Sequence, residues 1–408
     1  MRFVVAQMGA RRSYAVPLVL EQAGLLEVFY TDFAGNVGKG EWLSRIARLL
    51  GFKAAAERLQ HRRVPDAITG KTVTVGRPVS WLVNNCVARP MNGAGRFRQH
   101  LRWGKFLGHA INRTGFGSAT HLYSMLGEFG PALSGAKEAG LSVVTEFYIC
   151  LSTERVIEKE QRVFNTWEPQ APDLDSVRRE FSDERDLVAS TDFAICPSEA
   201  VASDLASEFR FPPNRSAVVP YGIALERFES SSRPVAGKVL FVGTVGLRKG
   251  VHYLAMAAEE LAGRGRHYEF LVAGDVTPQI AKHPACRHLR FLGRVPRHDI
   301  AAQFSMADVF VLPSLAEGSA EATYEALAAG LPVITTAATG SVVRHEIEGL
   351  LVPERNSHAL ASAIERVIED RRFRARLGAA ARLRAREYSI EKYGGRLVKA
   401  LKSFVRSA

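Results

Sequence analysis

The second half of the chain alternates short β-branched runs with longer stretches of helical periodicity, and this alternation restricts the fold more than any other feature. The expected strands are residues 238–242, 268–273, 289–292, 308–312 and 333–336, and the expected helices are residues 250–261, 298–304 and 357–368. Strands that alternate with helices pair in parallel and are covered on both faces. The pattern therefore predicts a doubly wound α/β domain.

The first half is less regular but ends in the same style. Strands are expected at residues 1–7, 142–146, 193–197 and 217–220, with a helix at residues 198–209. Residues 229–237 form a polar stretch that carries proline and glycine, as domain linkers do. We therefore expect an N-terminal domain at residues 1–228 and a C-terminal domain at residues 238–387, with a ligand cleft between them.

An acidic loop follows the expected strand at residues 308–312 and leads into a helix. It carries Glu317 and Glu325, which are eight positions apart. If the helix begins near Ala320, Glu325 lies about 7 Å along its axis, roughly the length of a diphosphate. A helix N-terminus attracts phosphate, and carboxylates beside it can accept hydrogen bonds from sugar hydroxyls. The spacing fits a nucleotide-sugar site, and it equally fits a solvated helix start, where acidic residues are common.

A second loop places two cations near the start of the C-terminal domain. Gly243 and Gly246 permit a tight turn from strand to helix, and Arg248 and Lys249 stand where the next helix begins. Cations oppose the dipole at a helix N-terminus, so this loop requires a compensating anion. A diphosphate suits it, and the alternative is a solvated helix start with basic residues.

The net charge of +12 is confined to the N-terminal part of the chain. Residues 1–113 hold 18 Lys and Arg against 6 Asp and Glu, and the remaining residues hold 36 of each kind. In the basic segment 41–113, apolar and basic residues alternate at helical spacing: Trp42, Leu43, Ile46, Leu49, Leu50 and Phe52 with Arg45, Arg48 and Lys53. This pattern fits an anionic membrane surface, and equally the outer face of a soluble protein. Nucleic acid is not expected, because no recognised motif for it appears.

The cysteines predict neither a disulfide framework nor a zinc site, because Cys86, Cys150, Cys196 and Cys286 show no paired spacing. The run 173–175, Asp-Leu-Asp, reads as a solvated loop rather than a metal site. No stretch approaches the ~20 apolar residues of a spanning helix. We expect a cytoplasmic protein, with peripheral attachment to the inner membrane face as an open alternative.

Both loops belong to a longer series of short motifs that resembles the retaining glycosyltransferases of the GT-B fold, in particular glycosyltransferase family 4. The series runs in family order through residues 218–224 and 228, 242–243 with 249–250, 271–274, 291–295, 307–309 with 313–314, and the paired glutamates through 330–334. The resemblance implies two Rossmann-like doubly wound domains that face each other across a cleft. In that fold the last helix, here within residues 388–408, crosses back to the N-terminal domain.

The resemblance also implies an activity: transfer of a sugar from a nucleotide-sugar to a glycan or lipid-linked acceptor in polysaccharide or glycolipid biosynthesis, with no metal or cofactor. Arg248 and Lys249 would neutralise the diphosphate, and Glu317 would contact the donor sugar. Glu325 would bind the ribose hydroxyls. The further donor contacts are implied at Gly243, Thr244, Gly318, the backbone around Val295, and the N–H groups of Ser319, Ala320 and Glu321. Catalysis would rest on stabilising the charge of the departing nucleoside diphosphate.

The chain departs from the family pattern in four places. Thr244 stands where an arginine usually follows the first glycine, and residues 319–322 replace the usual Phe-Gly-Leu-Pro. The turn after the first strand is normally rich in glycine, whereas here it holds Arg11 and Arg12. Glu146 stands where a histidine often follows a middle strand. Glu146 is either an acceptor-side polar group, together with Arg11 and Arg12, or a strand-end surface carboxylate.

Two other functions remain open. A GT-B nucleotide-sugar epimerase would need no acceptor, and the basic segment argues against it. A non-catalytic sugar-nucleotide-binding or membrane scaffold protein is favoured by the altered acidic loop and the missing histidine.

Overall fold

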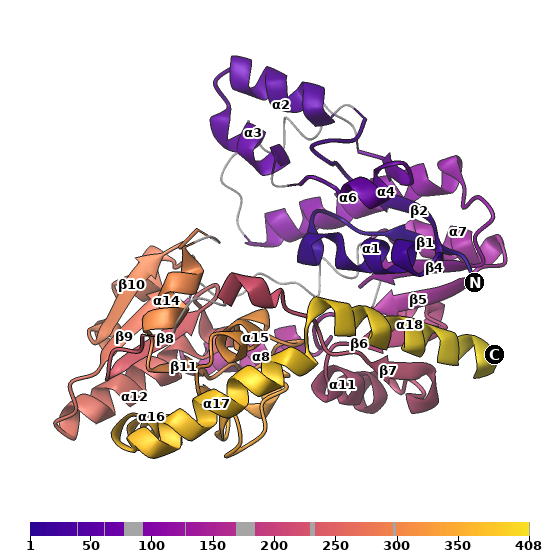
Figure 1. Ribbon diagram of the computed structural model, residues 1–408. Helices are drawn as coiled ribbons and strands as arrows, with labels where there is room; N and C mark the ends of the chain where they lie inside the picture. The colour runs from indigo at the N-terminus through magenta and orange to yellow at the C-terminus, as the bar shows by residue number, and fades with distance from the viewer. Residues whose placement is uncertain are drawn as a thin grey trace.

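The structure is a computed structural model that describes residues 1–38, 40–60, 62–76, 93–126, 128–168, 184–228, 233–296 and 299–407. Two α/β domains lie side by side (Figure 1). The first four residues of the expected linker, 229–232, lie outside the described residues, as do Cys86 and the Asp-Leu-Asp run at 173–175.

Seven parallel strands form the N-terminal sheet in the order β3-β2-β1-β4-β5-β6-β7. Their bounds are β1 (Phe3–Ala6), β2 (Leu26–Thr31), β3 (Thr72–Thr74), β4 (His121–Met125), β5 (Ser142–Glu146), β6 (Phe193–Cys196) and β7 (Ser216–Val218). The helices are α1 (Ala15–Gln22), α2 (Gly40–Leu49), α3 (Lys53–Gln60), α4 (Asp66–Thr69), α6 (Gly93–Thr114), α7 (Gly130–Glu138), α8 (Thr153–Val163), α10 (Glu184–Ser190) and α11 (Glu199–Phe209). The strand order reverses between β1 and β4, so the carboxyl ends of these strands form a crevice where open sheets bind ligands.

Six parallel strands form the C-terminal sheet in the order β10-β9-β8-β11-β12-β13. Their bounds are β8 (Lys238–Val242), β9 (Glu269–Ala273), β10 (Leu289–Gly293), β11 (Val309–Leu312), β12 (Val333–Thr335) and β13 (Gly349–Leu351). The helices are α12 (Val251–Gly263), α13 (Pro278–Ala281), α14 (Ile300–Met306), α15 (Glu321–Ala328), α16 (Ser357–Glu369) and α17 (Arg371–Glu387). The strand order reverses between β8 and β11. The basic loop, residues 243–250, follows β8, and the acidic loop, residues 313–320, follows β11. The predicted fold class, two doubly wound α/β domains, is confirmed.

The last helix, α18 (Ile390–Ser407), lies against the N-terminal domain although it follows the C-terminal one (Figure 1). Phe404 stacks on Phe193 of β6 with 4.7 Å between the ring centroids. Tyr393 accepts a hydrogen bond from Arg12 at 2.9 Å. Among the described helices, none is long and apolar enough to cross a membrane.

Helix α8 belongs to the N-terminal half of the sequence but is anchored on the C-terminal domain. Glu160, which is buried, accepts hydrogen bonds from His252 Nε2 at 2.9 Å, Tyr253 Oη at 2.6 Å and Arg355 Nε at 2.8 Å. Three side chains of the C-terminal domain therefore donate to one buried carboxylate of α8, and these hydrogen bonds fix how the domains meet.

The apolar and basic residues at helical spacing lie in two helices rather than one, because α2 ends at Leu49 and α3 begins at Lys53. Gly51 breaks the helix with a φ of +81°, a conformation that glycine adopts without strain. The two helices form a hairpin whose inner residues pack together: Leu43, Ala47, Ala56 and Leu59, with Phe33.

Candidate functional site

The structure brings the acidic and basic loops of the C-terminal domain into direct contact. Glu317 Oε1 lies 2.6 Å from Arg248 Nη1 and 2.7 Å from Lys249 Nζ. Arg248 and Lys249 belong to a 3-10 turn between β8 and α12, and Glu317 belongs to the loop between β11 and α15. All three side chains therefore meet beyond the carboxyl ends of β8 and β11, at the reversal of strand order.

Hydrogen bonds to backbone carbonyls hold the basic and acidic loops together. The N–H of Leu315 donates to the carbonyl of Arg248 at 2.8 Å, and Arg248 Nη1 donates to the carbonyl of Ala316 at 3.1 Å. Gly250 has a φ of +73°, and a Cβ there would lie 2.0 Å from the carbonyl oxygen of Pro313. Only glycine permits this approach.

The three charged groups are largely shielded from water. The side chains of Lys249 and Glu317 are each 11% exposed, and that of Arg248 is 29% exposed. Burial lowers the pKa of Lys249, and the nearby Glu317 opposes that shift. Burial alone would raise the pKa of Glu317, but Lys249 and Arg248 bring it below its usual value. Two cations, Arg248 and Lys249, lie within ion-pair distance of the Glu317 carboxylate. The three groups together carry a net positive charge, which favours the binding of a further anion.

Part of the negative charge that the basic loop requires comes from Glu168, which the sequence did not single out. Its Oε1 accepts a hydrogen bond from the N–H of Leu247 at 2.7 Å. Glu168 follows α8, so the segment that docks on the C-terminal domain also fixes the start of the basic loop. No local motif marks it, because the contact spans 79 positions in sequence.

Helix α15 begins at Glu321 with Ala320 before it, as the sequence predicts. Glu325 forms an ion pair with Arg227, whose Nη1 lies 3.3 Å from Glu325 Oε1. Of the three backbone donors implied for the sugar, that of Ala320 is already used, because it donates to the carbonyl of Thr339 at 3.2 Å. The Ser319 hydroxyl lies 2.8 Å from the Tyr324 hydroxyl and donates to the Gly340 carbonyl. Glu321 is exposed.

The other residues implied to contact the donor follow strands β8 and β10, at the carboxyl ends of the C-terminal sheet. Gly243 follows β8 with its N–H donating to the carbonyl of Ala273 at 2.9 Å. A Cβ on Gly243 would lie 2.8 Å from the side chain of Lys249. Thr244 is exposed and Val295, after β10, is half-buried.

Gly318 joins the acidic loop to the N-terminal domain. A Cβ at this position would lie 1.7 Å from the carbonyl oxygen of Tyr148, so no side chain fits. The Gly318 carbonyl accepts a hydrogen bond from the Ser198 hydroxyl, and the Glu317 carbonyl accepts one from the Cys150 thiol at 3.6 Å. The acidic loop is therefore a second point, besides the Glu168 contact, where the two domains touch beside the site.

Arg11 lies in the turn after β1 of the N-terminal domain and pairs with Glu128, a carboxylate that the sequence did not single out. Arg11 also donates to the Tyr148 hydroxyl at 3.0 Å, and its guanidinium lies 4.1 Å from the Tyr148 ring centroid. Burial raises the pKa of Glu128, although Arg11 and the Met8 amide act in the opposite direction. Glu128 follows β4, a strand that the sequence did not predict.

Arg12 and Glu146 form a second, buried pair. Tyr123 donates to Glu146 Oε2 at 2.6 Å, and Arg12 lies 4.3 Å from the Tyr221 ring centroid. The interpretation of Glu146 as a surface carboxylate is wrong, because only 2% of the residue is exposed. Its partners occupy both carboxylate oxygens, so Glu146 supports the turn at Arg12 rather than pointing into solvent.

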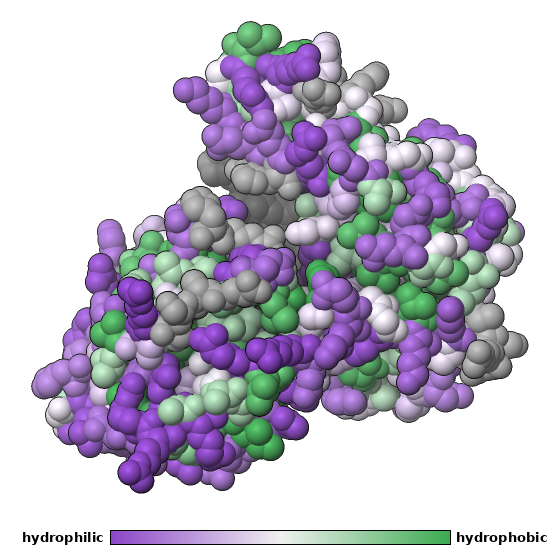
Figure 2. All heavy atoms as spheres, in the orientation of Figure 1, coloured by the Kyte–Doolittle hydropathy of each residue, from purple (hydrophilic) through white to green (hydrophobic). Residues whose placement is uncertain are grey.

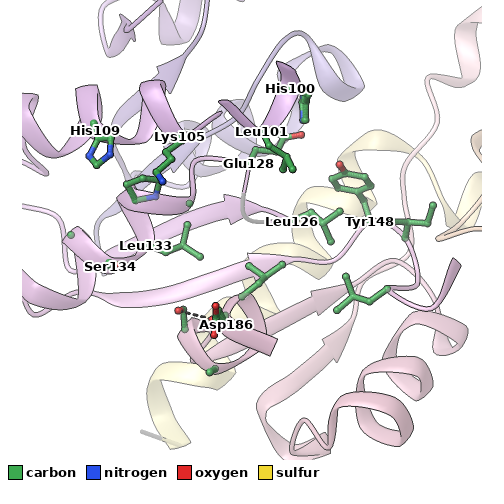
Figure 3. Close-up of a pocket in the computed structure, with 18 of the residues that line it drawn as sticks. His100, Leu101, Lys105, His109, Leu126, Glu128, Leu133, Ser134, Tyr148 and Asp186 are labelled. Carbon is green, nitrogen blue, oxygen red and sulfur yellow. Dashed lines mark hydrogen bonds between the residues drawn. The ribbon is translucent and has the colours of Figure 1, made fainter. Parts of the chain in front are cut away.

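A cavity of about 920 Å³ lies in the N-terminal domain next to Tyr148 (Figure 3). His100, Leu101, Lys105 and His109 come from α6 along one wall. The other lining side chains include Leu126, Glu128, Leu133, Tyr148, Leu151 and Asp186. The lining also includes Cys150, whose thiol bonds to the Glu317 carbonyl, so the cavity begins beside the acidic loop.

Comparison with known proteins identifies relatives of the C-terminal domain. Residues 224–384 match the family model of glycosyl transferases group 1. Alpha-D-kanosaminyltransferase from Streptomyces kanamyceticus is 32% identical over 42% of this chain and 46% of its own length. The chain thus spans about half the length of the curated relatives it matches.

Solved structures are similar over the whole chain. Sucrose-phosphate synthase from Thermosynechococcus elongatus has a TM-score of 0.70 at 16% identity and covers 100% of both chains. Anabaena HepE in complex with UDP and glucose has a TM-score of 0.61 at 16% identity, covering 99% of this chain and 100% of its own. The chain therefore has the GT-B fold, and residues 224–384 are similar to the glycosyl transferases group 1 family.

Proposed function

We propose that this protein is a retaining glycosyltransferase that moves a sugar from a nucleotide-sugar to a hydroxyl group of a glycan or lipid-linked acceptor. The observation that carries the proposal is the convergence of Arg248 and Lys249 on Glu317 at the strand reversal of the family-matched domain. The UDP and glucose bound by HepE support a nucleotide-sugar as the donor.

The two cations supply what the reaction needs most. In the transfer, the bond between the anomeric carbon and the phosphate oxygen breaks, and its electron pair stays on the departing diphosphate. The acceptor oxygen bonds to the anomeric carbon on the face that the phosphate leaves, and the diphosphate takes up the hydroxyl proton. Cations fixed beforehand in a shielded site stabilise that charge without reorganising, an effect worth a few kcal/mol per group. Arg248 and Lys249 therefore take the role that a metal ion has in other transferases.

Glu317 has two tasks in this proposal. It holds both cations in place through ion pairs of 2.6 and 2.7 Å, and its carboxylate faces the donor sugar. Glu325 contacts the ribose, which requires it to exchange its ion pair with Arg227. The cavity of about 920 Å³ takes the acceptor, because it opens beside the acidic loop and combines apolar and charged walls.

The test is transfer of a radiolabelled sugar from a panel of nucleotide-sugars to glycan and lipid-linked acceptors. Glu317→Ala and Lys249→Ala are compared with Lys282→Ala, which removes an exposed lysine of the same domain. We expect both site variants to lose at least about 100-fold in kcat/KM, the usual cost of removing one such group. Full activity in both variants would show that the site is elsewhere.

The same assay addresses the remaining features. The anomeric configuration of the product, read by NMR, matches the donor if the enzyme retains it, and a chelator leaves the rate unchanged. Turnover of donor without acceptor would identify an epimerase instead. The cavity of the N-terminal domain supports the transferase over that alternative, because an epimerase needs no acceptor site.

A further inference from the structure

The hairpin of α2 and α3 stands out from the body of the N-terminal domain (Figure 1) and exposes large apolar side chains. Trp42 is 59% exposed, Leu49 85%, Leu50 62% and Phe52 39%. The other large apolar side chains exposed among the described residues are spread along the chain: Val163, Val235, Ile347, Leu383 and Ile390. A local concentration of this kind marks an interaction surface.

The hairpin does not need these residues for its own packing. Its inner core consists of other side chains, Leu43 and Ala47 from α2 with Ala56 and Leu59 from α3. Trp42 and Leu49 are two helical turns apart and so lie on one side of α2. Leu50 and Phe52 flank Gly51 in the turn that joins the helices. The four side chains thus occupy the outer side and the turn of the hairpin.

Exposed cations stand among these apolar residues. Arg45 and Arg48 lie between Trp42 and Leu49 along α2, and Lys53 follows the turn. Figure 2 shows apolar side chains at the tip of this projection with hydrophilic ones around them. Apolar side chains interleaved with cations are typical of helices that lie in the interface of anionic bilayers.

We propose that the outer side and turn of the α2–α3 hairpin dock the N-terminal domain on an anionic membrane surface. Leu49, Leu50 and Phe52 enter the headgroup layer, Trp42 lies at its boundary, and the cations meet lipid phosphates. A second copy of the chain fits less well, because two identical hairpins would bring like charges together. The proposal extends the proposed function by bringing the acceptor cavity near membrane lipids, yet it is testable without donor or acceptor.

Flotation with vesicles is the experiment. Vesicles of phosphatidylcholine alone are compared with vesicles that also contain phosphatidylglycerol, at low and high salt. We expect binding to the anionic vesicles and at least about tenfold weaker binding when the anionic lipid is absent or salt is raised. Binding to neither kind of vesicle, or equal binding to both, would overturn the proposal.

Two variants locate the binding surface. Leu49→Ser with Leu50→Ser should weaken anionic vesicle binding at least about tenfold. The matched control, Leu383→Ser, removes a leucine with the same 62% exposure as Leu50 but from α17, and should bind as the wild type does. Circular dichroism checks that both variants keep their fold. Equal binding by the double variant and the wild type would place the contact elsewhere.

Fluorescence and sedimentation complete the test. Emission from Trp42 should shift to the blue when anionic vesicles are added, and Trp42→Phe should lose that shift. Analytical ultracentrifugation without lipid should find the same mass for the wild type and the double variant. A wild-type dimer that the leucine substitutions dissolve would show that this surface binds a second copy, and would contradict membrane docking.

Discussion

The Lys249 ammonium lies 2.7 Å from the Glu317 carboxylate, and each side chain is only 11% exposed. A cation buried to this degree depends on its partner, because breaking a buried pair leaves an uncompensated charge. The pair therefore stabilises the arrangement of the basic and acidic loops before any ligand is present.

This dependence predicts a non-additive pair of substitutions. Glu317→Leu alone should lower the free energy of unfolding by roughly 3 kcal/mol, because Lys249 and Arg248 then repel each other in a shielded site. Glu317→Leu combined with Lys249→Met should cost less than the sum of the single changes, by about 1 to 2 kcal/mol. Urea unfolding of the four proteins measures the coupling, and strictly additive costs would mean that the pair contributes nothing.

Gly318 predicts an effect on transfer that leaves donor binding intact. In Gly318→Ala the new methyl group would meet the Tyr148 carbonyl, so the domains cannot close on the acidic loop. We expect at least a tenfold lower rate of transfer, an estimate from the sensitivity of catalysis to misplacement of about 1 Å. Nucleoside diphosphate affinity should stay within about twofold.

Gly263→Ala is the matched control for that change. A Cβ at Gly263 meets no atom within 4 Å, and the residue has an ordinary backbone conformation. Its transfer rate should equal that of the wild type. An unaltered rate in Gly318→Ala would show that the domains separate at this contact during turnover.

Glu160 predicts a specific dependence of stability on pH. Burial by itself raises its pKa, but hydrogen bonds from His252, Tyr253 and Arg355 lower it from 4.5 to about 2. Between pH 4.5 and about pH 2 the unfolded chain therefore binds more protons than the folded one. The stability that the Glu160 carboxylate contributes is fully present above pH 4.5 and is lost as the pH falls toward 2. At ~1.4 kcal/mol per pKa unit this amounts to roughly 3 kcal/mol.

Urea unfolding from pH 6 to pH 3 should show a smaller loss of stability in Glu160→Gln than in the wild type. Glu57→Gln, which removes an exposed carboxylate, should follow the wild-type curve. Parallel curves for Glu160→Gln and the wild type would mean that the interdomain hydrogen bonds do not lower this pKa.

The turn after β1 predicts a stabilising substitution. Arg12, Ser13 and Tyr14 have φ values of 45°, 51° and 63°, a left-handed conformation that costs residues with a Cβ about 1 to 2 kcal/mol each. Ser13 is exposed, so Ser13→Gly should raise the free energy of unfolding by about 0.5 to 1 kcal/mol. Ser13→Ala keeps the strain and should leave stability unchanged. Thermal unfolding distinguishes them, and a glycine variant less stable than wild type would contradict this explanation.

The sequence predicted β8 to β12 of the C-terminal sheet because these strands are short, mostly apolar runs with clear boundaries, but it missed β13, Gly349–Leu351. Residues 238–242 were expected as a strand, and β8 has the same bounds. In the N-terminal sheet, β2, β3 and β4 were missed. The β4 sequence, His-Leu-Tyr-Ser-Met, contains no β-branched residue, so nothing local marks it as a strand.

The site was predictable only where it depends on local sequence. The loops that carry Lys249 and Glu317 follow strands of the expected kind, so their meeting follows from the strand order. Glu128 was missed because it follows the unpredicted β4. The contacts of Gly318 with Tyr148 and Ser198 depend on how the domains dock, which local sequence does not specify.

Calorimetric titration of the protein with a panel of nucleoside diphosphates tests directly whether Arg248 and Lys249 bind the diphosphate of a donor. We expect saturable binding of at least one of them. Binding should be at least about tenfold weaker in Lys249→Met, because a charge-assisted contact is lost, and unchanged in Lys282→Ala. Binding that Lys249→Met leaves at full strength, or no binding of any nucleoside diphosphate, would contradict this role of the two cations.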